Sequence, residues 1–161
     1  MVDNATRHSS RWYGLIMVRR LGLVALLVLL GGTTWADERT DELKRVVNRN
    51  TGYAHMTRGV NMYTLIALRS CVTENDIPVL THMLDDRDYV MQLAAAGVLV
   101  DLGAAGQRAL EGARSRPTDV RTRIMIDDAL HEARSPDRRP LKDYPLSEQE
   151  RKSIRGCAPK R

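Results

Sequence analysis

The two cysteines, Cys71 and Cys157, are the residues of this sequence best suited to covalent chemistry. In an oxidising compartment we expect them to form a disulfide that ties the C-terminal tail back to the rest of the chain. On the chain-entropy model, closing so long a loop stabilises the fold by ~4 kcal/mol. The alternative is a buried free thiol together with a reactive thiol in the tail. A catalytic cysteine is less favoured, because the sequence ties no histidine to either thiol.

Two His-Met pairs, His55-Met56 and His82-Met83, combine imidazole and thioether groups, which suit Cu(I). Neighbouring side chains on a helix point about 100° apart, so neither pair makes a site by itself. The aspartates within residues 85–88 lack the later glycine and glutamate of a calcium loop, and we interpret them as helix caps and turn residues. The sequence therefore predicts no metal and no cofactor.

Motifs of catalysis are also missing from the sequence. It has no phosphate-cradling glycine loop, no serine-centred nucleophile motif and no zinc-ligand spacing. Asp127 and Asp128 are neighbours, so on a helix they face different sides and do not form a general acid/base pair. Nucleic acid is not an expected partner, because there is no basic helical stripe with stacking aromatics. We predict a protein that is not an enzyme.

The N-terminal 36 residues have the layout of a secretory signal. Four arginines precede an apolar run at residues 21–30, and small residues up to Ala36 lead into the acidic pair Asp37-Glu38. The run is about half of the ~20 apolar residues that a membrane-spanning helix needs. We expect removal of residues 1–36, only transient membrane contact, and a periplasmic or secreted location. An uncleaved anchor, with residues 14–18 extending the run, is the alternative. Translation begins at Met1 or Met17, and the compact start Met17-Val-Arg-Arg favours Met17.

Composition favours one helical domain with a tail. The chain has 161 residues, of which 43% are hydrophobic and only 4% aromatic, and it contains no Phe. An aromatic-poor core is built more easily from helices packed through Ala, Leu and Val than from sheets. Residues 134–161 carry nine Lys and Arg against four Asp and Glu, on a mildly acidic body at residues 37–133. The sequence thus predicts an all-α fold with a basic, proline-containing tail.

Residues 76–103 give the clearest helical pattern. Asn75 or Asp76 can cap a first helix, and Pro78 then falls in its first turn, where a missing N–H costs little. Asp88 can cap a second helix, and residues 89–102 are apolar nearly all round, which predicts burial on several sides. Gly103 is a natural C-terminal stop.

Residues 83–103, Met-Leu-Asp-Asp-Arg-Asp-Tyr-Val-Met-Gln-Leu-Ala-Ala-Ala-Gly-Val-Leu-Val-Asp-Leu-Gly, resemble the core of a HEAT-type helical repeat in its short bacterial form. That pattern is two leucines, an Asp-rich turn, Val-Arg, an Ala-rich run and Leu-Gly. Here Met91 and Gln92 replace Val-Arg, and Arg87 stands where Pro is frequent. Residues 60–68 overlay residues 91–99, and residues 119–130 restore the Val-Arg pair. The resemblance covers residues 40–133, most closely in the middle.

The resemblance implies a short right-handed α-solenoid of about three HEAT-like helical hairpins over residues 37–133. The first helices of the outer hairpins are expected at residues 41–48 and 105–113. From Arg134 onward we expect an irregular tail with one short helix at residues 147–154, because Ser147 and Glu150 form a capping box.

Proteins of this kind commonly bind along a groove lined by the second helix of each unit. Asn61, Gln92 and Arg121 are equivalent on the overlay and would form a polar ladder facing a partner. The alternative is that they bond the turn aspartates Asp88 and Asp119 and hold adjacent units in register. On the same overlay, an inward-facing apolar residue precedes each ladder member: Val60, Met91 and Val120. Cys71 is expected on the inward face of its helix. Arg87, Tyr89 and Tyr63 are further candidate contacts with the partner, because Tyr and Arg are enriched at interface hot spots.

These patterns predict an exported, non-catalytic protein-binding module whose partner is another protein. A more specific alternative is a periplasmic immunity or inhibitor protein that blocks a toxin or hydrolase, which small size, export and a disulfide permit. A third alternative is similarity to the HEAT-like lyases that attach bilin pigments. Export and the lack of a cofactor signature argue against it.

Overall fold

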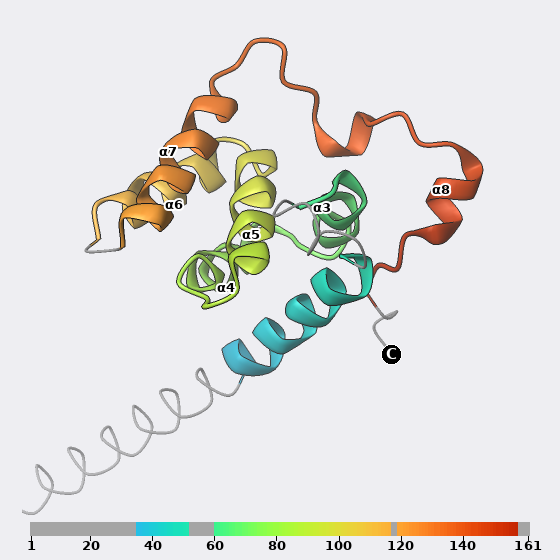
Figure 1. Ribbon diagram of the computed structural model, residues 1–161, viewed down its shortest axis with the longest axis horizontal. Coiled ribbons are helices and arrows are strands. Elements are labelled where there is room, and N and C mark those ends of the chain that lie inside the picture. The colour runs from blue at the N-terminus through green and yellow to red at the C-terminus, as the bar shows by residue number, and fades with distance from the viewer. Residues whose placement is uncertain (1–34, 52–59, 117–118, 158–161) are drawn as a thin grey trace, which may run out of the picture. The chain divides into compact units, whose positions relative to one another are not determined.

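A computed structural model (Figure 1) describes residues 35–51, 60–116 and 119–157, and all regular structure in these residues is helical. The chain divides into two compact units, Met1–Glu38 and Arg39–Arg161, and the contacts discussed below lie within the second. The predicted signal falls outside the described residues except for its last two positions. Among the described helices, none combines the length and hydropathy needed to cross a membrane.

The prediction of an all-α fold is confirmed for the described residues. Residues 35–50 are helical, and short 3-10 turns occur at Glu74–Asp76 and Leu141–Asp143. The other helices are α3 (Met62–Arg69), α4 (Ile77–Met83), α5 (Tyr89–Asp101), α6 (Ala104–Arg114), α7 (Val120–Ala133) and α8 (Glu148–Ser153). The tail helix α8 begins with the predicted capping box of Ser147 and Glu150.

Helix α5 is the central helix of the fold. The Asp88 side chain accepts a hydrogen bond from the Val90 N–H at 2.9 Å and so caps the N-terminus, as predicted. The helix is buried around most of its circumference, because α3, α4, α6 and α7 all contact it. Gly103, just after the helix, has a positive φ of 70°, where a side chain would be strained. The sequence thus predicted this helix and both of its ends.

Helices α3 to α7 lie in two rows. Helices α3, α5 and α7 contact one another in that order, and α4 contacts α6 (Figure 1). Leu43 and Val47 of the first helical segment join the same hydrophobic core. Helices α3, α4, α6 and α7 each contribute buried residues on one side, such as Gly106, Leu110 and Ala113 of α6, whereas α8 has none. Burial of these residues against neighbouring helices stabilises elements too short to be stable alone.

Gly106 is required for the close packing of α6 on α5. A Cβ added at Gly106 would lie 1.8 Å from the Leu99 carbonyl oxygen, whereas one added at Gly112 of the same helix meets nothing within 4 Å. We expect Gly106→Ala to lower the free energy of unfolding by about 3 kcal/mol, because backbone must move. Gly112→Ala should raise it by about 0.5–1 kcal/mol through helix propensity. Urea denaturation followed by circular dichroism measures both; equal stability of the two variants would contradict the close approach.

Two placements differ from the prediction. Cys71 was expected on the inward face of a helix, but α3 ends at Arg69 and Cys71 lies half-buried in the following turn. Val120 was expected to face inward but is 71% exposed. The reason is the phase of α7: Asp119 caps the helix, and the buried stripe then falls on Thr122, Met125, Ile126, Ala129 and Leu130.

The buried carboxylate of Asp101, at the end of α5, attaches the tail to the helices. Its side chain is 3% exposed. One oxygen accepts a hydrogen bond from Arg69 Nε at 2.7 Å, and the other accepts bonds from Arg138 at 3.0 Å and from the Leu141 N–H at 2.8 Å. One side chain thus joins α3, α5 and the start of the tail.

Two contacts hold the later part of the tail. The Tyr63 hydroxyl donates to the Glu150 carboxylate at 2.6 Å, and Asn50 exchanges two hydrogen bonds with the backbone of Arg155. Hydrogen bonds with Ser147 and Tyr63 lower the pKa of Glu150 to about 2, so this carboxylate is ionised at neutral pH. Both contacts fix the tail against the first described helix and α3.

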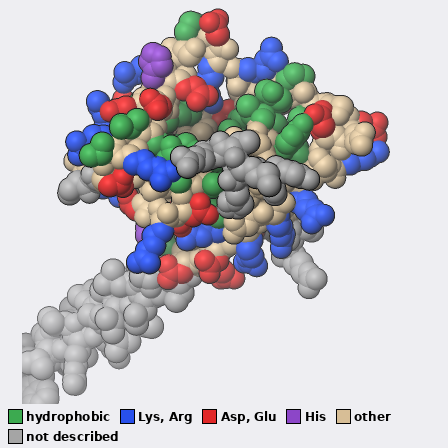
Figure 2. Space-filling view, viewed as in Figure 1, with side chains coloured by type: hydrophobic (Ala, Val, Ile, Leu, Met, Phe, Trp, Pro, Cys, Tyr) green, Lys and Arg blue, Asp and Glu red, His purple; other side chains and the backbone are tan. Residues whose placement is uncertain are grey.

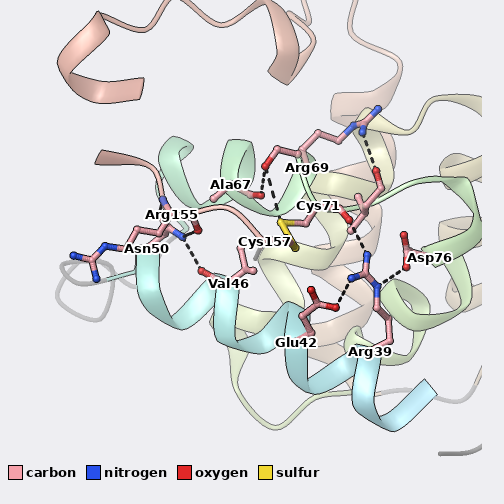
Figure 3. Close-up of a disulfide and its surroundings, with 12 residues drawn as sticks. Arg39, Glu42, Val46, Asn50, Ala67, Arg69, Cys71, Asp76, Arg155 and Cys157 are labelled. Carbon is pink, nitrogen blue, oxygen red and sulfur yellow. Dashed lines mark hydrogen bonds and ion pairs between the residues drawn. A yellow bond between two sulfur atoms is a disulfide. The ribbon is translucent and has the colours of Figure 1, made fainter. Parts of the chain in front are cut away.

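The disulfide joins Cys71 to Cys157, with Cα atoms 5.4 Å apart (Figure 3). Beside it, the buried Arg39 donates to the Cys71 carbonyl and to Asp76, each at 2.7 Å. Burial by itself raises the pKa of Asp76, but hydrogen bonds from Arg39 and Thr73 outweigh it, and the net pKa lies below the ordinary value. The first helical segment, the turn after α3 and the end of the tail therefore meet at one point.

Candidate functional site

The predicted polar ladder is engaged in contacts within the chain. Asn61 caps α3 by accepting from the Thr64 N–H at 2.8 Å, and its amide donates to the Asn50 carbonyl. The Gln92 side-chain amide donates to the Asp86 carbonyl at 2.8 Å and to the Thr122 hydroxyl at 3.3 Å. Gln92 contacts Asp88 through its backbone N–H, which donates to the Asp88 carbonyl at 3.2 Å as part of the helix. Gln92 reaches Asp119 through Thr122, whose hydroxyl donates to the Asp119 carboxylate.

The third ladder residue, Arg121, is exposed and differs from the other two. Its guanidinium lies over the Tyr89 ring, 3.6 Å from the ring centroid, and so connects α7 to α5 by a cation–π contact. Arg87 is exposed in the turn between α4 and α5 and lines a separate hollow with Lys44 and His82. The structure thus brings together Arg121 and Tyr89 but places Asn61, Gln92 and Arg87 elsewhere.

A groove of about 320 Å³ lies along the row of helices α3, α5 and α7. Most of its lining is apolar or small, and two carboxylates from α7 complete it. The lining residues are Val60, Leu65, Tyr89, Leu93, Ala96, Gly97, Met125, Asp128, Ala129 and Glu132. Of the predicted partner-binding residues, Tyr89 alone belongs to this set.

The spacing of residues on the two longer helices explains this lining. Tyr89, Leu93 and Gly97 recur every four residues on α5 and therefore share one face. On α7, Met125 and Ala129 form the buried part of the wall, and Asp128 and Glu132 lie beside them in the exposed part. The Leu65 side chain packs directly on Gly97, since a Cβ added there would lie 2.9 Å from a Leu65 methyl. The groove is a shallow apolar surface with acidic groups along one side.

Among the described residues, no lysine or arginine forms an ion pair with the acidic groups of the groove. Asp127 pairs with Arg114 at 2.6 Å, and Glu111 pairs with Arg134 at 3.6 Å, both outside the groove. Asp128 and Glu132, by contrast, have no lysine or arginine within ion-pair distance among the described residues. Figure 2 shows acidic and apolar side chains next to one another over α7. The charge of these two carboxylates is therefore available to a ligand.

No group of three or more His, Cys, Asp or Glu side chains in the described residues could hold a metal ion. His82 is exposed while Met83 is buried, so that pair does not converge on one point. The other pair, His55-Met56, lies outside the described residues. Every buried side-chain nitrogen and oxygen in the described part of the chain has a hydrogen-bond partner.

Sequence reasoning missed most of the groove residues, and the reason differs between the helices. Helix α5 is apolar on every side, so its pattern does not mark which face is open. On α7 a signal was readable, because Asp128 and Glu132 lie four residues apart beside the apolar Met125 and Ala129. The ladder prediction used Gln92, whose side chain bonds Asp86 and Thr122 outside the groove, and Arg121, which lies over the groove residue Tyr89 but is not part of the groove lining.

Comparison of the chain with protein-family models, with curated proteins and with solved structures gives no match.

Proposed function

We propose that this chain is an exported, non-catalytic protein-binding module, built as a short right-handed α-solenoid of HEAT-like hairpins. The binding face is the groove along α3, α5 and α7. The partner is another protein, and the location is the periplasm or the cell exterior.

The order of helix contacts supports the solenoid. In stacked helical hairpins the second helices of successive units pack in one row and the first helices in another. Here α3, α5 and α7 form one row, while α4 and α6 are in contact as first helices of the second and third units. The disulfide supports export, because such bonds persist mainly in oxidising compartments.

The observation that carries the binding proposal is the groove itself. It runs along the row of second helices, which is the side on which helical repeats commonly bind. Its floor exposes half-buried apolar side chains, including Leu65 and Leu93, that no other described element covers. Partly open apolar surface bordered by charge is typical of protein interaction sites.

Site-specific photo-crosslinking in the producing cell tests this function. A photoreactive amino acid is introduced at the position of Leu93 in the groove, or at Gly112 on the exposed side of α6 as the control. We expect a discrete crosslinked protein from the first position alone. Absence of adducts at Leu93, or identical adducts at both positions, would contradict the groove as a binding face.

A further inference from the structure

We propose that the α3/α5/α7 groove receives a basic side chain of the partner protein, a Lys or Arg that is flanked by apolar residues. This inference rests on the proposed function and specifies the chemistry of the partner. The aliphatic part of the side chain would lie on the apolar floor, and its charged end would reach the carboxylates of Asp128 and Glu132.

The dimensions of the groove fit such a side chain. About 320 Å³ is at the lower end of the range for ligand pockets, which suits one or two side chains better than a cofactor. Leu93 and Gly97 provide an apolar surface on which a hydrocarbon stem can lie. Lys and Arg commonly bury their stems on apolar surface while the charged end stays in a polar environment.

Charge complementarity selects a basic group. Asp128 and Glu132 are four residues apart on α7, about 6 Å along its axis, so one cation can contact both carboxylates. Neither carboxylate has an ion-pair partner among the described residues, whereas their neighbours Asp127 and Glu111 do. The cation of Arg121 is engaged with Tyr89, seven residues before Asp128 on the same helix. An acidic or neutral partner segment would leave the two groove carboxylates without compensation.

The described residues of the basic tail, up to position 157, do not fill this role in the same chain. They bind Asp101, Tyr63 and Asn50, and none of them lines the groove. Binding of the tail of a second copy in the groove can be distinguished from binding of a different protein, because it would make the protein self-associate with increasing concentration.

Short synthetic peptides in which Leu alternates with Lys, with Glu or with Ser serve as probes. They are titrated into the full processed chain, and binding is followed by amide chemical shifts in NMR. We expect the Leu-Lys peptide alone to shift Leu93, Gly97 and their neighbours in the groove. The variant Asp128→Asn/Glu132→Gln should bind it about five- to tenfold more weakly, the size expected for two exposed ion pairs.

The matched control is Asp127→Asn/Glu111→Gln, which has the same net charge but changes carboxylates outside the groove. It should keep the affinity of the unaltered chain. Equal weakening in both variants would overturn the inference, as would equal binding of the Leu-Ser or Leu-Glu peptide in the groove. In those cases an adduct at Leu93 would leave the proposed protein-binding function standing. If the unaltered chain self-associates with increasing concentration and Asp128→Asn/Glu132→Gln does not, the occupant of the groove is a second copy of this chain. That result would overturn the inference that the occupant is a different protein.

Discussion

Replacing both cysteines, Cys71→Ser/Cys157→Ser, is expected to lower the free energy of unfolding by about 4 kcal/mol. The disulfide closes a loop across a sequence separation of 86 residues, so its removal releases much conformational freedom in the unfolded chain. Hydrogen bonds through Asp101, Glu150 and Asn50 still hold the tail in the folded state, so helix content at low temperature should change little. Urea denaturation followed by circular dichroism gives both quantities.

The single variants Cys71→Ser and Cys157→Ser are the matched controls. Each removes the same covalent bond, so each should lose as much stability as the double variant, and a reducing agent should bring the unaltered chain to the same level. A decrease in the free energy of unfolding below about 1 kcal/mol would mean that the unfolded chain gains little conformational freedom when the disulfide is removed, contrary to the chain-entropy model.

Local signals in the sequence were sufficient to predict the central helix α5 and the tail helix α8. Asp88 and Gly103 bracket α5, and Ser147 with Glu150 starts α8, because caps and stops depend on a few adjacent residues. The pairing of Cys71 with Cys157 was predictable for a different reason, since two cysteines in an oxidising compartment allow a single intramolecular disulfide.

The rest depended on distant contacts that a periodic pattern does not contain. Asp101 looked like one more polar residue at a helix end, yet Arg69 and Arg138 reach it from positions more than 30 residues away. Val120 was predicted to face inward, but it is exposed to solvent, because the buried side of α7 begins at Thr122. The groove requires knowing which side of the apolar α5 stays uncovered, and neighbouring helices decide that.

Replacing the central carboxylate, Asp101→Asn, should lower the free energy of unfolding by about 3 kcal/mol. Breaking a buried ion pair leaves the opposite charges without compensation, and here Arg69 and Arg138 both lose their anion. The new amide also places an N–H group where the carboxylate accepted three hydrogen bonds. Hydrogen exchange at the Leu141 amide should accelerate, because that N–H loses its charged acceptor, and urea denaturation measures the change in stability.

The control for this variant is Asp127→Asn, which removes an ion pair of similar length, 2.6 Å to Arg114, from the exposed surface of α7. Exposed pairs contribute roughly 0–1 kcal/mol, so this variant should be close to the unaltered chain. If the two variants were equally stable, the Asp101 carboxylate would not be the attachment point of the tail. If Asp101→Asn lost stability while Leu141 exchange stayed slow, the carboxylate would serve the pairing with Arg69 alone. We expect Asp101→Asn to lose stability and slow exchange at Leu141 together, because the same two carboxylate oxygens join α3, α5 and the tail.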